Sequence, residues 1–373
     1  MASQARELAD KSIAPPGRRN LIINGAMNVA QRGTSITNFT GNSQYHTVDR
    51  FVYENSGPSS ADFAQVTDAP SGFRKSLKAT LNGAFNPSAS QYFIPFQQRI
   101  ESQDIVFLDY GTANAKTVTL SFWIKSNKTG TYVVEFSNNS KTRKWSQSYT
   151  INAANTWEQK IITWTGDTGA GTSFDDDNES GAAFYWWMSG GTTFTSGSLS
   201  GAWEDGNNAN RAVGVPSSLA DDDQFYLTGV QLEVGTVATE FEHRSFGEEL
   251  ALCQRYFCKS FRPDVAPTQD FFHQNDAVSG SITAYSSTTG YVSGQIKFPV
   301  TMRALPDIVF YQTSLGSTSN RWQYFKAGSG WGDLSTNSPD NKTQDGFRPS
   351  VTGTFTVNQF ILYFGGYTAE AEL

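Results

Sequence analysis

The chain is poor in the residue types that most enzymes and metal sites use. Its 373 residues include two cysteines and three histidines. Cys253 and Cys258 are five positions apart on one expected helix, where they face different sides, so an internal disulfide is not expected. His46, His243 and His273 belong to no nucleophile elbow, HExxH motif, phosphate loop or dinucleotide fingerprint. These absences argue against a disulfide scaffold and against the common hydrolase and nucleotide-binding classes.

Charge and long apolar runs are also scarce. Charged residues make up 17% of the chain and the net charge is −7, whereas a general nucleic-acid surface needs an excess of basic residues. No apolar run is long enough to span a bilayer, and residues 1–20 lack the apolar core of a signal peptide. We therefore expect a protein that binds no nucleic acid, is not inserted in a membrane and is not secreted by the usual route. The unpaired cysteines fit synthesis in a reducing cytoplasm.

Glycine, aromatic residues and strand patterns are abundant. The chain contains 33 glycines and 14% aromatic residues, which favours short strands between tight turns. In residues 117–126 the side chains alternate, so that Phe122 lies on one face and Trp123 on the other. Seven or more segments of this kind precede residue 244. They predict an all-β fold whose main domain, residues 20–244, is a jelly-roll-like sandwich of two sheets.

The segments before and at the start of this sandwich have distinct patterns. Residues 1–19 have too few apolar groups to fold alone and run into Pro15, Pro16 and Gly17, so they are expected to be an arm that is frayed or docked on a partner. The apolar residues 21–23 then predict a buried strand, because the turn dipeptide Asn24-Gly25 follows them.

Residues 245–261 have the pattern of a short amphipathic helix. Ser245 is the expected N-cap, and Pro263 follows the helix. Its apolar residues repeat at heptad spacing, so the helix is expected to trimerise, although the same stripe could instead pack on its own sandwich. After it, residues 262–373 return to strand patterns and predict a second β-sandwich domain. The helical seam consists of Phe246, Leu250, Cys253 and Phe257.

Three stretches resemble a known family. They read NLIINGAMNVAQRGTS near the start, YLTGVQLEVGTVATEFEHRSFGEELALCQRYF in the middle and YTAEAEL at the end. Together they resemble the tail-fibre and receptor-binding proteins of tailed bacteriophages, especially the type that resembles carbohydrate-binding modules. The sandwich loops and the interior of the last domain match nothing in that family.

The resemblance implies a virion protein, made in the host cytoplasm and carried outside on the particle. It implies a homotrimer that is held together by the helix 245–261. It also implies that residues 1–19 of each chain dock on other virion proteins. The distal β domains would adhere to a host-surface receptor, which we expect to be a glycan, and no enzyme activity is expected. The alternatives are a structural fibre of the head, neck or tail that binds no receptor and, least favoured, a glycan-cleaving spike.

Glycan recognition needs flat aromatic faces beside amides or carboxylates. Trp203 lies in a polar loop of the sandwich, and residues 321–333 place several aromatic side chains among glycines. A fibre attached by its N-terminus presents its C-terminal domain to the cell first, so residues 262–373 are the expected receptor-binding tip. Each of these aromatic residues could instead have a packing role. The receptor-binding candidates are Trp203, Trp322, Tyr324 and Trp331.

No cofactor is required by the sequence, but the resemblance implies a structural calcium ion. Loop carboxylates supply the hard oxygen ligands that calcium prefers. The alternative is that these carboxylates are solvated or paired with basic residues. Runs of aspartate at 175–177 and 221–223 are read in the same way, as loop charges and not as a catalytic pair. The metal-ligand candidates are Asp49, Asp175, Asp177 and Glu233.

Overall fold

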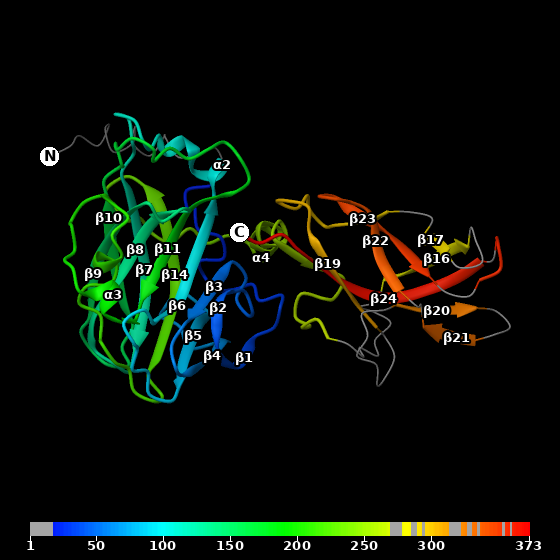
Figure 1. Cartoon of the computed structure of the whole chain (residues 1–373), viewed down its shortest axis with the longest axis horizontal. Helices are drawn as coiled ribbons and strands as arrows, with labels where there is room; N and C mark the ends of the chain where they lie inside the picture. The colour runs from blue at the N-terminus through cyan, green and yellow to red at the C-terminus, as the bar shows by residue number, and fades with distance from the viewer. Residues whose placement is uncertain are drawn as a thin grey trace. The chain divides into compact units, whose positions relative to one another are not determined.

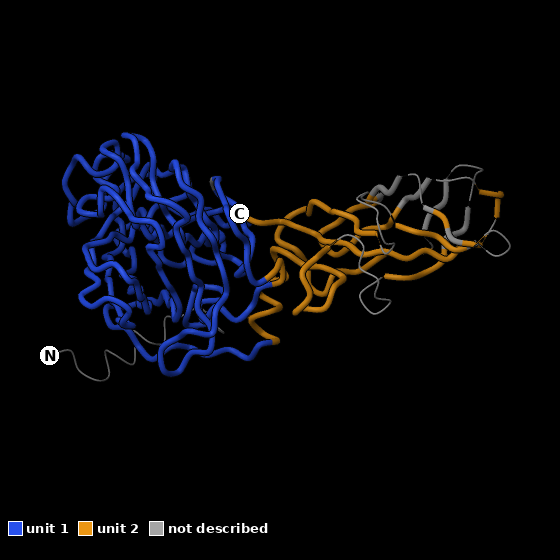
Figure 2. The backbone as a smooth tube through the Cα atoms, turned by 90° about the horizontal axis from the view of Figure 1, so that it is seen from below, with its two compact units in different colours: residues 1–30, 34–246, 373 blue, residues 31–33, 247–372 orange. Residues whose placement is uncertain are grey.

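The computed structural model confirms the all-β fold, in which short helices interrupt a long series of strands (Figure 1). The chain forms two compact units: unit 1 comprises residues 1–30, 34–246 and 373, and unit 2 comprises residues 31–33 and 247–372 (Figure 2). This division lies close to the predicted end of the sandwich at residue 244. The structure describes residues 18–268, 278–284, 289–292, 295–312, 322–326, 330–333, 336–352, 355–358 and 360–373.

Unit 1 is a sandwich of two antiparallel sheets. One has six strands in the order β1-β4-β5-β14-β7-β10. The other has eight, with β13-β9-β8-β11-β6-β3-β2 in sequence and β12 paired with β6. The six-stranded sheet is formed by β1 (Ser35–Phe39), β4 (Ser60–Val66), β5 (Ser76–Asn82), β14 (Gln224–Val234), β7 (Val118–Ser126) and β10 (Glu158–Trp164). The eight-stranded sheet is formed by β13 (Glu204–Asp205), β9 (Arg143–Ile151), β8 (Gly130–Asn138), β11 (Ser180–Trp187), β6 (Tyr92–Glu101), β3 (Phe51–Asn55), β2 (Gly41–Gln44) and β12 (Ser189–Gly190).

The core of unit 1 lies between these sheets and follows the predicted alternation. Phe122 of β7 points inward, and its ring meets that of Trp186 of β11 edge to face with centroids 5.7 Å apart. Both side chains have no exposed surface. Full burial of such side chains contributes about 1.5–3 kcal/mol each. The short helices α2 (Ser102–Ile105) and η1 (Val106–Leu108) connect β6 to β7.

The outer face of the eight-stranded sheet is covered by the chain itself. Trp187, next to Trp186 in β11, points away from the core but is also fully buried, so alternation is a poor guide to its exposure. It packs with Phe194 of α3 (Thr192–Thr195) in a separate apolar cluster. Arg211, just after η2 (Asn208–Asn210), donates to both carboxylate oxygens of Glu135 at 2.8 and 2.9 Å. This buried ion pair fastens the covering segment to the sheet.

The N-terminal part of unit 1 differs from the prediction. Residues 21–23 are buried but form no strand. The N–H of Leu21 donates to the carbonyl of Leu232, whereas the N–H of Ile23 donates to the side-chain amide of Gln98. Polar side chains therefore satisfy backbone groups that a strand would pair. Residues 1–17 of the predicted arm lie outside the described residues.

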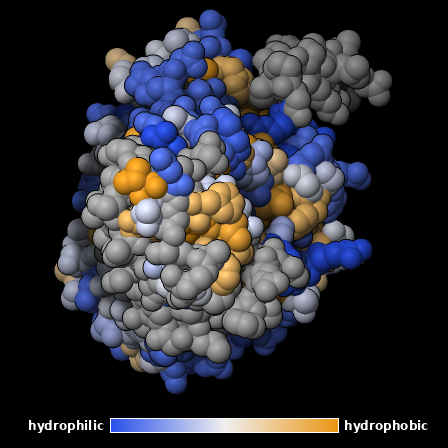
Figure 3. Space-filling view, turned by 90° about the vertical axis from the view of Figure 1, so that its right-hand side faces the viewer, coloured by the Kyte–Doolittle hydropathy of each residue, from blue (hydrophilic) through white to orange (hydrophobic). Residues whose placement is uncertain are grey.

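Unit 2 is built on a ten-stranded antiparallel sheet. Its main order is β18-β23-β17-β16-β24-β20-β21, with β15 and β19 paired with β24, and β22 with β23. Its described part exposes several large apolar side chains, and Figure 3 shows hydrophobic residues at the surface on one side of the molecule. The strands are β15 (Phe257–Lys259), β16 (Val278–Ala284), β17 (Thr289–Val292), β18 (Ile296–Lys297), β19 (Asp307–Tyr311), β20 (Gln323–Lys326), β21 (Gly330–Asp333), β22 (Thr336–Thr343), β23 (Gly346–Thr352) and β24 (Phe360–Glu370).

The predicted helix 245–261 is shorter than expected. α4 spans Phe246–Gln254 and begins directly after the predicted N-cap, Ser245. The chain then enters β15, so Cys258 lies on a strand and not on the helix. The main-chain pairing of β15 with β24 replaces the last turns of the helix. No helix among the described residues is long and apolar enough to cross a membrane.

This shorter helix breaks the predicted trimer seam. Phe246 is 52% exposed and Leu250 is half-buried, but Cys253 and Phe257 are buried within the single chain. Phe257 belongs to β15, and the guanidinium of Arg32 lies 3.8 Å from its ring centroid. The assignment of Cys253 and Phe257 to a subunit interface is therefore wrong, because both side chains are already buried within the single chain.

Candidate functional site

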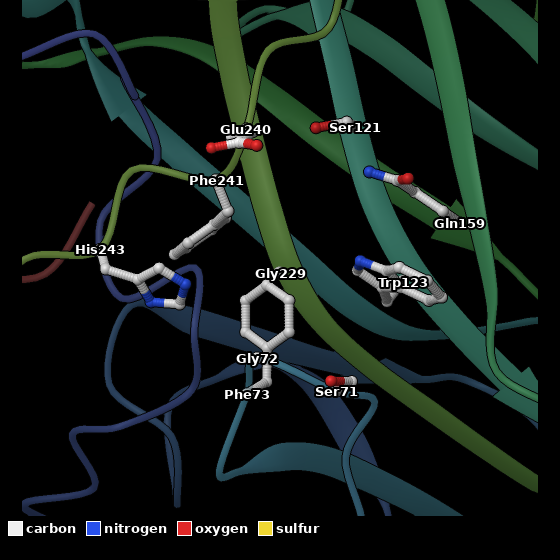
Figure 4. A pocket seen from close by; sticks show the side chains of 10 residues that line it. All are labelled: Ser71, Gly72, Phe73, Ser121, Trp123, Gln159, Gly229, Glu240, Phe241 and His243. Atoms are coloured by element: carbon white, nitrogen blue, oxygen red, sulfur yellow. The ribbon is translucent and has the colours of Figure 1, made fainter.

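A pocket of about 370 Å³ lies on the outer face of the six-stranded sheet in unit 1 (Figure 4). Its floor comes from three neighbouring strands, and its walls come from the loop between β4 and β5 and from the segment after β14. It is lined by Ser71, Gly72, Phe73, Ser121, Trp123, Gln159, Gly229, Glu240, Phe241 and His243.

Trp123 is the central strand residue of the pocket. It lies on β7 between Phe122 and Ile124, which are both buried in the core, so its indole points outward and stays partly exposed. Its main-chain partners are Gln159 of β10 and Thr228 of β14. The sequence pattern had placed Trp123 opposite the Phe122 face, and this is confirmed.

Gly229 allows two aromatic rings to close over the sheet. It sits where the pairing of β14 with β7 shifts register, and its φ is 61°. A Cβ atom at this position would lie 2.7 Å from Phe73 Cζ and 2.8 Å from Trp123 Cδ1. Contacts this short do not occur, and a positive φ also strains residues with a side chain. Glycine is thus required for both the bulge and the ring packing.

Phe73, Phe241 and His243 form an aromatic wall beside Trp123. The Phe73 and Phe241 rings meet edge to face with centroids 4.9 Å apart. His243 lies 4.9 Å from Phe241 and 5.4 Å from Phe73, measured between ring centroids. Phe73 and Phe241 are half-buried and His243 is exposed. The wall therefore presents aromatic surface to solvent in a fixed arrangement.

Polar groups complete the pocket. In the view of Figure 4, Glu240, Ser121 and Gln159 lie above the rings of Trp123 and Phe73. Glu240 and Gln159 are exposed, and their side chains make no hydrogen bond with the residues that the structure describes. A carboxylate and an amide are therefore free to bind hydroxyl groups of a ligand.

The wall segment 239–244 is held by the N-terminal residues of unit 1. The N–H groups of Arg19 and Asn20 donate to the two carboxylate oxygens of Glu242 at 3.1 and 2.9 Å. Arg244 donates to the same carboxylate at 3.0 Å and to the carbonyl of Asn20. The Arg19 side chain donates to the carbonyl of Glu240. We call these contacts the Glu242 clasp; they position the main chain that carries Glu240, Phe241 and His243.

The Glu242 clasp is expected to weaken in acid. Partial burial alone would raise the pKa of Glu242, but the N–H groups of Asn20 and Arg19 and the charge of Arg244 outweigh it and hold that pKa below its ordinary value of 4.5. A pKa lowered on folding gives stability that is complete above the unfolded pKa and is lost as pH falls through the folded pKa. Below about pH 4.5, stability should therefore fall less steeply in Glu242→Gln than in the wild type. Urea unfolding at a series of pH values in this range measures the free energy of unfolding of both proteins. If that free energy changes with pH equally in the wild type and in Glu242→Gln, the prediction is contradicted.

The predicted receptor-binding residues do not line this pocket. Trp203 packs against the core of unit 1, and its indole N–H donates to the carbonyl of Thr165. Trp322 is fully buried in unit 2 and stacks on Tyr363 with centroids 5.2 Å apart. A side chain with no exposed surface cannot contact a glycan, so the assignment of Trp322 is wrong.

The other two candidates belong to unit 2. Tyr324 is half-buried and packs edge to face against Phe355, with centroids 6.1 Å apart. Trp331 lies on β21, opposite Phe325 of β20, but its side chain is outside the described part of the chain. The receptor assignments of Tyr324, Trp331 and Trp203 therefore remain predictions.

The four predicted metal ligands do not come together. Glu233 is buried and bonded to Gln231 and Thr239, and Asp49 is buried next to Val29. Asp175 and Asp177 lie exposed in the loop before β11. In the described part of the chain, no group of three or more histidine, cysteine, aspartate or glutamate side chains is arranged to hold a metal ion. The proposed calcium set is not supported.

Phe73, Phe241 and His243 were missed because they come from irregular segments far apart in the sequence. Period-two alternation identifies outward-facing residues only inside strands. Of the aromatic residues in the pocket, it therefore identified Trp123 and none of the others. The only feature of the sequence that indicates the bulge at Gly229 is a glycine inside a strong strand pattern.

The chain matches no protein-family model and no curated protein. Among solved structures it is similar to a tailspike domain of bacteriophage CBA120, described as enzymatically active, with 14% identity, a TM-score of 0.29 and coverage of 54% of this chain and 22% of that one. It is also similar to a CBM4 structure (14% identity, TM-score 0.31, 57% and 98% covered). A third is a family 11 carbohydrate-binding module from Clostridium thermocellum with a mixed-linked tetrasaccharide (10% identity, TM-score 0.27, 55% and 97% covered).

Proposed function

We propose that unit 1 binds a neutral glycan in the pocket around Trp123. The observation that carries this proposal is the combination, in one open pocket, of fixed aromatic rings with a carboxylate and an amide that the described residues leave unbonded. Sugar rings present an apolar C–H face that packs on aromatic rings, and a rim of hydroxyl groups that bonds amides and carboxylates. The charge of Glu240 disfavours sugars with acidic groups.

Binding without cleavage is the better-supported activity. Most glycoside hydrolases use two carboxylic acids on opposite sides of the scissile bond. Of the ten residues that line the pocket, Glu240 alone carries a carboxylate. A glycan-cleaving spike therefore stays the less favoured alternative.

The biological setting that we propose is a phage fibre that adheres to a host cell. Its support is the sequence resemblance of the three motifs, in family order, to tail-fibre proteins. The receptor would then be a host-surface glycan. A structural fibre without a receptor is the second candidate, and the test below separates the two.

A glycan array probed with the full-length protein tests the function. We expect binding to neutral glycans, and we expect Trp123→Ala to weaken it by roughly 30-fold, because losing a central aromatic anchor costs about 2 kcal/mol or more. Val106→Ala is the control, since it removes an exposed apolar side chain of η1 outside the pocket. A wild-type protein that binds no glycan on the array and does not adhere to host cells would favour the structural fibre.

Assembly into a homotrimer remains part of the proposal. With Cys253 and Phe257 buried, the seam on α4 is reduced to Phe246 and Leu250. Light scattering of the full chain should give three times the chain mass. Phe246→Asp should lower this mass without unfolding the protein, because the side chain is 52% exposed in the single chain. A monomeric wild type at micromolar concentration would refute the trimer.

A further inference from the structure

A second aromatic group lies next to the pocket on the same face of the sheet. Trp157 directly precedes β10, and the Nζ of Lys125 lies 5.3 Å from its ring centroid. Tyr226 of β14, the main-chain partner of Lys125, meets Trp157 edge to face with centroids 6.1 Å apart. Lys125 is two residues from Trp123 on β7, so the two groups are neighbours along one strand.

Trp157 is held in place from two directions while its ring stays partly exposed. Its indole N–H donates to Asp68 Oδ1 at 3.1 Å, and Asp68 is paired with Lys125. Next to it, the carboxylate of Glu158 accepts the N–H groups of Asn152 and Ala153 at 2.8 and 2.9 Å, which fixes the turn between β9 and β10. An exposed ring with fixed orientation loses little entropy when a ligand packs on it.

Residues of the two aromatic groups lie side by side along two neighbouring strands of the sheet. We define the outer-face strip as Trp157, just before β10, with Gln159 and Ile161 of β10 and Lys125, Trp123 and Ser121 of β7. Gln159 pairs with Trp123 and Ile161 pairs with Ser121. Ile161 is 57% exposed, so the strip ends in another uncovered apolar side chain. At about 3.3 Å per residue, Trp157 and Ile161 are about 13 Å apart along the strand.

We propose that the outer-face strip binds several consecutive units of a linear neutral oligosaccharide, with Trp157 packing on a unit beside the one that Trp123 holds. This inference rests on the proposed function of the Trp123 pocket. A single pyranose ring is shorter than the strip and would leave Trp157 and Ile161 uncovered. Lys125 does not favour an acidic sugar, because its charge is already paired with that of Asp68.

Calorimetric titration with oligosaccharides of graded length tests the strip. The probes are the cellulose, laminarin, maltose and galactan series, each from monosaccharide to hexasaccharide, added to the full-length protein. Wild-type affinity should rise at least about tenfold between the shortest member that binds and the hexasaccharide. Trp157→Ala should lower hexasaccharide affinity by about tenfold and leave the shortest binding member unchanged. Trp157→Phe keeps a ring but loses the bond to Asp68, so its affinity should lie in between.

The outcomes separate this inference from the proposed function. Binding that is lost in Trp123→Ala but is equal at every length would overturn the strip and keep the pocket. The strip is also overturned if Trp157→Ala weakens all members equally or none. If the wild type binds no member of the four series, the strip is overturned whatever the array shows. If the array is also negative and the protein does not adhere to host cells, the proposed function is overturned with it. Melting curves of each variant establish that the protein tested is folded.

Discussion

Replacing Arg211 with alanine is expected to lower the free energy of unfolding of unit 1 by about 3–5 kcal/mol. The guanidinium bonds both oxygens of Glu135, whose side chain has no exposed surface. The change therefore strips a buried carboxylate of its bidentate partner, and this costs far more than breaking an exposed pair. Arg211 also lies 4.8 Å from the ring centroid of Trp187, so the covering segment loses its attachment. Urea unfolding followed by tryptophan fluorescence measures the loss.

Two controls give this result its meaning. Arg74→Ala, at an exposed arginine, should change stability by no more than about 0.5 kcal/mol. The double variant Glu135→Leu with Arg211→Met replaces the pair by apolar groups of similar size, and it should recover most of the loss. If Arg211→Ala costs no more than Arg74→Ala, the buried pair does not hold the covering segment.

Replacing Gly229 with alanine is expected to abolish most glycan binding without removing any side chain from the pocket. The new Cβ would collide with the rings of Phe73 and Trp123, which must then separate. Displacing both aromatic anchors should weaken binding by at least roughly 30-fold, since anchors of this kind contribute about 2 kcal/mol or more. Binding of the neutral glycans selected on the array measures the effect.

Gly201 offers a matched control. Its φ of 68° is close to the 61° of Gly229, but a Cβ there would meet nothing within 4 Å. Gly201→Ala therefore adds a similar backbone strain, about 1–2 kcal/mol, without any collision. Both variants should lose comparable stability from strain, yet glycan affinity should fall only in Gly229→Ala. Equal affinities in the two variants would show that ring packing over Gly229 is unimportant for binding.

Strand patterns predicted the fold well because the alternation at β7 is enforced by burial. Phe122 and Trp123 face opposite sides, as the sequence indicates. Alternation alone does not predict the burial of Trp187. The segment that buries it is a loop with two short helical turns, which the distant ion pair of Arg211 and Glu135 holds in place. Exposure of an outward residue is thus decided by tertiary structure that a local pattern does not contain.

The helix boundary and the site were harder to predict for the same reason. Heptad spacing continued through Phe257, but β24, over 100 residues later, pairs with that segment and makes it a strand. Phe73 and Phe241 meet only because the loop after β4 and the segment after β14 converge at Gly229. The spacing of residues in the sequence does not predict contacts of this kind between distant irregular segments.

The Glu242 clasp has a mechanical consequence. It ties Arg19 and Asn20 to Glu242 and Arg244, just before the chain passes into α4. Tension between these two points runs through the hydrogen bonds of the clasp and does not peel strands from the sandwich. The same short path includes the main chain of Glu240, Phe241 and His243. A pull applied between Asn20 and Arg244 would therefore load the wall of the pocket before the core.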